Sequence, residues 1–135
     1  MQQLYSMKNP HDTYRDQGVL TAGPMELILM LYNGLRKNIL LARRAMERAN
    51  PATAHAHLIK AQNIVSELIN SLDMSFEISR DLLALYEFTL SQLVKANVDK
   101  KSSALEPLLD IVDTLREAWQ QASSMQKGGM YEKED

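Results

Sequence analysis

The chain has no cysteine and few of the residues that interrupt helices. None of its 135 residues is Cys, and only 5 are Gly and 4 are Pro. The absence of Cys excludes a disulfide framework, a thiolate metal site and a cysteine nucleophile. Hydrophobic residues make up 45% of the chain and are rich in Leu and Ala, which is typical of a helical bundle.

Long apolar runs and a strong charge of one sign are also missing. No run approaches the roughly 18 apolar residues that a membrane-spanning helix needs, and the polar N-terminus lacks the apolar region of a signal peptide. We therefore expect a cytoplasmic protein without membrane insertion. The formal net charge of −2 and the pI near 5.9 argue against a nucleic-acid partner.

Four segments have the apolar spacing of amphipathic helices. Apolar residues recur every three or four positions in each of them, and polar connections separate them. Four helices of this length with short connections predict an all-α fold, an antiparallel up-down-up-down four-helix bundle. The predicted helices are residues 24–49, 53–72, 78–97 and 104–124.

The segments around these helices predict turns and chain ends. Asn50-Pro51 ends the first helix, residues 73–77 predict a turn, and the polar residues 98–103 predict a second turn. Residues 1–23 hold no helical period, so we interpret them as a mobile N-terminal arm or cap. The Gly-containing residues 125–135 predict a flexible tail after a bundle domain at 24–124.

The first predicted helix carries more apolar surface than one core can bury. Residues 27–32 are all apolar or aromatic and cover the full circumference of a helix. Further apolar residues lie off the core stripes, which predicts hydrophobic grooves that accept an amphipathic helix of a partner. Alternatively, the N-terminal arm or a second copy of the chain covers these apolar residues. The residues expected to need cover are Met25, Leu29, Tyr32, Ile59, Ile69 and Phe88.

Catalytic and cofactor motifs are missing. The sequence has no phosphate-binding Gly-rich loop, no supported Ser-His-Asp set and no Glu-x-x-His pair of the di-iron bundles. His55 and His57 are two positions apart, so a helix points them about 200° apart and they cannot chelate one metal. We expect no enzyme activity, no metal and no cofactor.

One short stretch suggests a different chemistry. Residues 57–61, HLIKA, resemble the phosphoacceptor stretch of histidine phosphotransfer domains, which are also four-helix bundles. Those domains usually set Gly after the Lys, where this chain has Ala61. A phosphotransfer bundle that uses His57 is therefore one alternative, and a structural, self-associating helical protein is another.

Four ordered motifs resemble the flagellar secretion chaperone family, FliS. The resemblance covers roughly residues 5–122. Two features depart from the usual family pattern: Asn33 stands where Asp is common, and the turn after Ser71-Leu72-Asp73 lacks the usual Gly pair. The motifs are TAGPMELILMLYNG at 21–34, KAQNIVSEL at 60–68 followed by SLD at 71–73, LYEF at 85–88, and LREAW at 115–119.

The resemblance implies a cytosolic export chaperone for flagellin. Such a chaperone binds the disordered C-terminal segment of flagellin, blocks premature polymerisation and delivers the complex to an export-gate component of the flagellar type III secretion system. An anti-sigma factor or a co-chaperone as a further partner, and a homodimer of the free protein, are left open. The positions that the resemblance and the exposed apolar pattern assign to flagellin binding are Tyr14, Leu29, Tyr32, Ile59, Gln62, Ile69 and Phe88.

Overall fold

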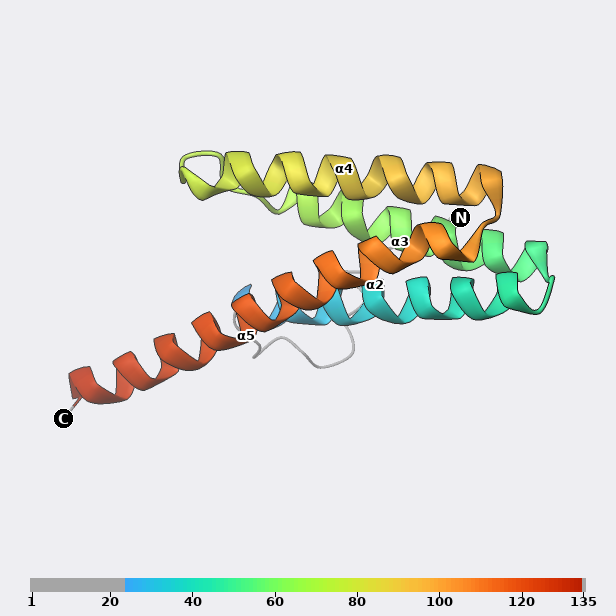
Figure 1. The fold of residues 1–135 in the computed structure, drawn as a ribbon. Coiled ribbons are helices and arrows are strands. Elements are labelled where there is room, and N and C mark those ends of the chain that lie inside the picture. The colour runs from blue at the N-terminus through green and yellow to red at the C-terminus, as the bar shows by residue number, and fades with distance from the viewer. Residues whose placement is uncertain (1–23, 135) are drawn as a thin grey trace, which may run out of the picture.

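The described part of the chain is an antiparallel helical bundle. The computed structural model describes residues 24–134, with side chains from 25 to 125, and within that range it has four α-helices, one short 3-10 helix and no strand. Successive helices run in opposite directions (Figure 1), which confirms the predicted all-α four-helix fold. The elements are α2 (Pro24–Glu47), α3 (Pro51–Asn70), α4 (Ile78–Asp99), η2 (Ser102–Leu105) and α5 (Glu106–Glu134).

Most helix ends lie within a few residues of their predicted positions, but the last helix differs. The expected start at Ala104 falls inside the 3-10 helix η2, and α5 itself begins at Glu106. The predicted end at Ser124 was too early, because α5 continues to Glu134. Pro107 lies in the first turn of α5, where its missing amide hydrogen has no helical partner to lose.

Local hydrogen bonds explain the sharp connection between α2 and α3. Ala49 has a positive φ of 54°, and the Asn50 amide donates back to the Ala45 carbonyl at 2.8 Å, which closes the end of α2. The Asn50 side chain then accepts a hydrogen bond from the Thr53 amide at 3.2 Å, and Pro51 fixes the first turn of α3. The predicted stop at Asn50-Pro51 is confirmed.

Asp73 organises the turn between α3 and α4, although the turn contains no glycine. Its Oδ1 accepts hydrogen bonds from the Ser75 amide at 3.0 Å and the Ser75 hydroxyl at 2.6 Å. The buried Ser79 hydroxyl donates to the Asp73 carbonyl at 2.6 Å. The two hydrogen bonds from Ser75 to the carboxylate hold the pKa of Asp73 below its usual value. Side-chain hydrogen bonds therefore shape a turn that contains no glycine.

The helices pack in the order α4, α3, α2, α5. The central pair α2 and α3 has the most extensive interface, α4 packs against α3, and α5 packs against α2. The helices α4 and α5 do not pack closely along their lengths, and η2 bridges them at one end. In Figure 1 these two helices diverge from that end. The core is therefore deepest along α2 and α3, and it is open between α4 and α5.

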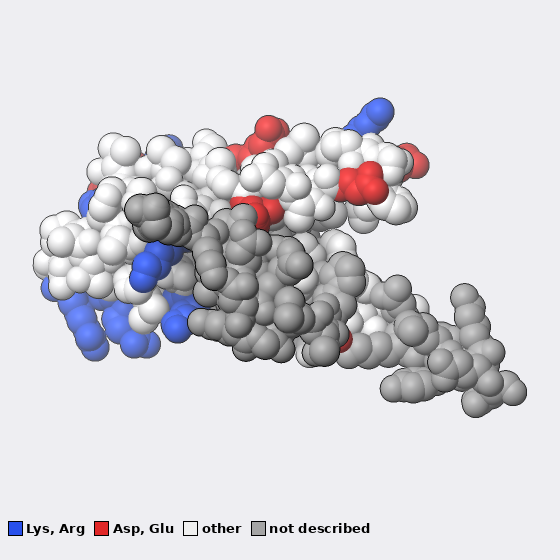
Figure 2. Space-filling model, turned by 180° about the vertical axis from the view of Figure 1, so that it is seen from behind, with Lys and Arg blue, Asp and Glu red and all other residues white. Residues whose placement is uncertain are grey.

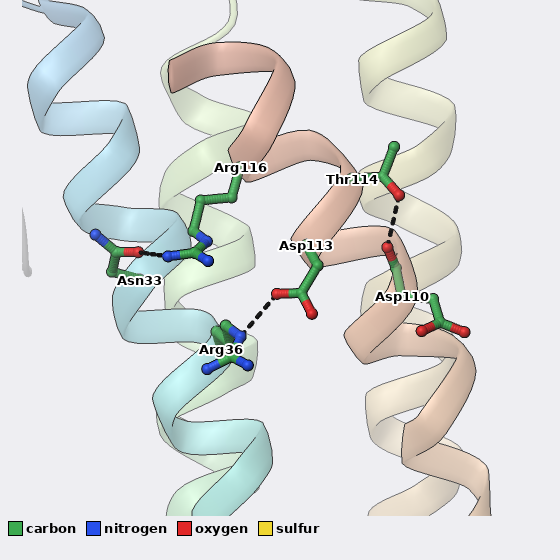
Figure 3. A network of polar contacts seen from close by, with 6 residues as sticks. All are labelled: Asn33, Arg36, Asp110, Asp113, Thr114 and Arg116. Carbon is green, nitrogen blue, oxygen red and sulfur yellow. Dashed lines mark hydrogen bonds and ion pairs between the residues drawn. The ribbon is translucent and has the colours of Figure 1, made fainter. Parts of the chain in front are cut away.

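Polar contacts fix α5 along α2 (Figure 3). Arg36 Nε donates to Asp113 Oδ1 at 2.7 Å, and Arg116 Nη1 donates to Asn33 Oδ1 at 3.2 Å. Arg43 pairs with Glu106 near the start of α5. The Arg36 and Asp113 side chains are part-exposed, so the pair adds little to stability. Its main effect is to set how α5 lies against α2.

No helix between residues 24 and 134 combines the length and the apolar character needed to cross a membrane. This agrees with the absence of a long apolar run in the sequence.

Replacement of Leu58 tests the position of the core. Leu58 is fully buried in α3, so Leu58→Ala should lower the free energy of unfolding by about 2–5 kcal/mol. The neighbouring Ile59 is 37% exposed, and Ile59→Ala should lower it by less than about 1 kcal/mol. Urea denaturation followed by circular dichroism measures both. Equal losses for the two variants would contradict this assignment of the core face.

Candidate binding groove

An apolar groove lies at the open end of the bundle. It has a volume of about 920 Å³ and receives residues from all four α-helices and from the turn between α3 and α4. We call it the end groove. Its lining is Met25, Leu27, Ile28, Leu31, Glu67, Asn70, Ser71, Leu72, Asp73, Phe76, Ile78, Ser79, Leu82, Tyr86, Leu115, Ala118, Trp119 and Ala122.

The end groove follows from the way the helices pack. The helices α4 and α5 diverge away from η2, so the first turns of α4 and the middle of α5 face each other without direct packing. The amphipathic helices keep their apolar stripes toward this space. A groove of this size with apolar walls is of the kind that takes an amphipathic helix.

Aromatic side chains connect the end groove to the core. Tyr86 and Trp119 line the groove, and the fully buried Tyr32 lies beneath them. The ring centroids of Tyr32 and Tyr86 are 6.5 Å apart, and those of Tyr32 and Trp119 are 6.4 Å apart. The two tyrosine hydroxyls hydrogen-bond to each other. Burial raises the pKa of both tyrosines above the usual value, so both hydroxyls stay protonated.

Two large apolar side chains at the mouth of the end groove are exposed. Phe76 is 61% exposed and Ile78 is 64% exposed, and both line the groove. The Asp73 turn holds them there, because Phe76 and Ile78 lie between its hydrogen-bonded residues Ser75 and Ser79. Exposed apolar residues at the mouth of an apolar groove indicate a contact surface for another polypeptide.

The charged residues that line the end groove within the described part of the chain are acidic. They are Glu67 and Asp73, and no Lys, Arg or His from residues 25–125 lines the groove. On the face drawn in Figure 2, most of the visible Lys and Arg gather at the lower edge, whereas most of the visible Asp and Glu lie in the upper layer. The basic residues of α2 lie in its second half and include Arg36 and Arg43, which already pair with acidic residues of α5.

The structure does not bring the sequence-predicted site residues together in this groove. Tyr14 lies outside the described residues, and none of the other six lines the end groove. The expectation that Tyr32 is exposed was wrong, because its side chain is fully buried in the core. A helical wheel of residues 24–49 places Tyr32 off the core stripe. However, α3 covers α2 on one side and α5 covers it on the other, so a wider arc of the surface of α2 is buried.

Three of the predicted residues form one stripe on α3. Ile59, Gln62 and Ile69 follow His55 at helical spacing, and His55 contacts Asn97 of α4. This side of α3 therefore faces α4. Ile59 is exposed, Gln62 is part-exposed, and Ile69 packs partly against the core. These residues form an outer flank of the α3–α4 pair, separate from the end groove.

Leu29 and Phe88 lie on other faces. Leu29 is part-exposed and precedes Arg36 by two helical turns, and Arg36 pairs with α5, so Leu29 lies on the α5 side of α2. Phe88 is half exposed on α4, on the opposite side of that helix from Asn97. A single groove does not hold these positions and the α3 stripe together.

The residues that sequence reasoning missed are those of the α3–α4 turn. Residues 73–77 were treated only as a connection, although Met74, Phe76 and Ile78 place three large apolar side chains within five positions. Such a density in a turn is a signal for a contact surface, since turns are usually polar. Trp119 of α5 also lines the end groove.

The two α3 histidines have separate surroundings. His57 Nδ1 lies 3.0 Å from Asn38 Oδ1 on α2, whereas His55 contacts Asn97 on α4. Partial burial and then the charges of Lys60 and Lys37 lower the pKa of His57. The two rings face different helices, in agreement with the helical spacing.

Comparisons with known proteins identify the family. The family model described as flagellar protein FliS matches residues 7–126. The flagellar secretion chaperone FliS of Bacillus subtilis (strain 168) is 39% identical over 117 residues, 87% of this chain and 88% of the relative. The corresponding Salmonella typhimurium protein is 30% identical over 111 residues, which covers 80% of this chain and 82% of the relative.

A more distant relative extends the same pattern. The flagellar secretion chaperone FliSB of Pseudomonas aeruginosa is 28% identical over 121 residues, 88% of this chain and 96% of the relative. The chain belongs to the FliS family, whose members compared above are named as flagellar secretion chaperones.

Removal of one hydroxyl from the tyrosine pair tests the link between core and groove. Tyr32→Phe leaves the buried Tyr86 hydroxyl without its partner and should lower the free energy of unfolding by about 1–3 kcal/mol. The double variant Tyr32→Phe/Tyr86→Phe removes both hydroxyls, so its loss should be smaller than the sum of the single losses. Urea denaturation of the wild type, Tyr32→Phe, Tyr86→Phe and the double variant gives the coupling energy between the two hydroxyls. Additive losses would contradict a hydrogen-bonded pair.

The buried pair Tyr32 and Tyr86 should make the folded protein less stable at alkaline pH. Both tyrosines have a raised pKa in the folded protein, so the unfolded chain loses their protons first as the pH rises above about 10. The folded state then binds more protons than the unfolded state, and the free energy of unfolding should fall with pH. Urea denaturation at about pH 8 and about pH 11 measures the fall. The fall in the free energy of unfolding should be smaller in Tyr32→Phe/Tyr86→Phe than in the wild type. An equal fall in both proteins would contradict the assignment of the raised pKa to these two tyrosines.

Proposed function

We propose that this protein is a cytosolic export chaperone that binds the disordered C-terminal segment of flagellin, prevents its premature polymerisation and delivers it to the flagellar export apparatus. The single observation that carries the proposal is the end groove, apolar, open and rimmed by Phe76 and Ile78, in a chain of the FliS family. The names of the relatives as flagellar secretion chaperones support the export role.

The physical basis is folding of the client upon binding. A disordered segment loses conformational entropy when it orders, and burial of its apolar face in the end groove offsets that loss. The bound segment forms a helix because a helix satisfies its own backbone hydrogen bonds in an apolar groove. Once its apolar face is buried in the chaperone, the same face is no longer free to pack against other flagellin subunits.

A long client contacts more than one surface of the bundle. Disordered segments can wrap around a large surface when they fold on it. The α3 stripe Ile59, Gln62 and Ile69, together with Leu29, Phe88 and Tyr14 of the N-terminal arm, stay predicted contacts outside the end groove. Tyr32 acts from below, through its contacts with Tyr86 and Trp119.

Variants at the mouth of the end groove test the proposal. Isothermal titration with a peptide of about 40 residues from a flagellin C-terminus should give saturable binding, a negative heat-capacity change and a gain of helix. Phe76→Ser/Ile78→Ser should weaken binding about tenfold or more, because two exposed apolar contacts are lost. The free protein should stay folded by circular dichroism.

Val98→Ser is the matched control. Val98 is 77% exposed near the end of α4, the helix that Ile78 begins, and it does not line the end groove. Its replacement should leave the affinity unchanged. The fluorescence of Trp119, the single tryptophan of the chain, gives a second readout, since its ring lines the groove. A cognate peptide that neither binds the folded protein nor changes this fluorescence would exclude the proposed function.

A further inference from the structure

A carboxylate oxygen in the end groove has no hydrogen-bond partner. Oε2 of Glu67 is buried from solvent, and no donor within the protein reaches it. Glu67 lines the groove among mostly apolar side chains. A buried carboxylate oxygen without a donor is unfavourable, because it has lost its hydration without replacement. A position with this cost indicates a donor that arrives with a binding partner.

The local electrostatics adds to the cost. Glu67 lies in the last turn of α3, where the partial negative charge of the helix end disfavours a carboxylate. Asp73, the other acidic residue of the lining, is already satisfied by Ser75. Two negative groups therefore share the groove, and none of its described lining residues is basic.

No ion pair or hydrogen bond joins Glu67 to a basic residue among the residues that the structure describes. Lys60 shares the same face of α3 but lies two turns away, about 10 Å along the helix, which is too far for an ion pair. Arg36 and Arg43 are paired with Asp113 and Glu106 of α5. A positive group that meets Glu67 must therefore come with the occupant of the end groove.

We infer that the end groove selects a helical segment that carries one lysine or arginine within its apolar face, positioned to donate to Glu67 Oε2. This inference rests on the proposed function and adds a rule for which part of the client occupies the groove. The apolar walls bind the leucine-like face of the helix, and Glu67 fixes its register through a charge-assisted hydrogen bond. An acidic residue at that point of a segment would be rejected by Glu67 and Asp73.

Glu67 then has an unfavourable effect in the free protein and a favourable effect in the complex. In the free protein Glu67 lowers stability, since its buried oxygen is unpaired. In the complex it contributes to affinity. A merely structural glutamate would do the reverse in the free protein, because its removal would destabilise the fold. This difference separates a selectivity residue from a structural one.

The test uses three variants of the full chain. Glu67→Gln keeps the shape and removes the charge, and Glu67→Met removes both polar oxygens at similar volume. Glu47→Gln is the matched control, because Glu47 is an exposed carboxylate at the end of α2 and does not line the end groove. Urea denaturation of the free proteins and isothermal titration with the flagellin C-terminal peptide are measured for each.

Both Glu67 variants should be at least as stable as the wild-type protein and should bind the peptide about tenfold or more weakly. Glu47→Gln should bind like the wild type. Replacement of each Lys and Arg of the peptide in turn by Met should identify one position whose loss weakens binding to the wild type but not to Glu67→Gln. That coupling assigns the partner of Glu67.

Three results would overturn the inference, and they are distinguishable. If the wild type binds the peptide and both Glu67 variants bind equally well, the selection rule is wrong and the proposed function stands. If the Glu67 variants are destabilised and no peptide residue couples to Glu67, the residue is structural. If the folded wild type does not bind a cognate peptide at all, the proposed function and this inference both fail.

Discussion

The absence of close packing between α4 and α5 is the constraint on which the other features of this protein depend. Both helices pack on the central α2–α3 pair, and η2 bridges them at one end only. Their apolar faces therefore remain apart at the other end, and the end groove lies between them. A closed four-helix arrangement would bury the same residues in the core. The bundle thus leaves apolar residues of the end groove outside a closed core, and the proposed function uses them as a surface for another polypeptide.

The Tyr32–Tyr86 hydrogen bond and the Trp119 ring join the floor of the end groove to the core. The Asp73 turn presents Phe76 and Ile78 at the mouth without the glycines that would loosen it. Glu67 is the exception, since its buried oxygen is unsatisfied within the chain. Preformed apolar walls favour affinity, whereas the single unpaired acceptor favours selectivity.

The secondary structure could be predicted from the sequence, because it depends on local signals. The apolar spacing predicted all four α-helices, and Asn50-Pro51 predicted the stop between α2 and α3. The end of α5 was placed too early, because Gly and polar residues after Ser124 suggested a frayed tail. The start of α5 was misplaced because a 3-10 turn and an α-helix have similar spacing over four residues.

The sequence by itself determined the number and direction of the helices, the family and the need for a partner surface, because periodicity, end signals and surplus apolar residues act locally. Only the tertiary structure decided where that surface lies. A helical wheel shows which residues lie off the core stripe, but not which neighbouring helix covers them. Tyr32 is therefore buried between helices, whereas Phe76, Ile78 and Trp119 meet at the end groove from segments far apart in the chain.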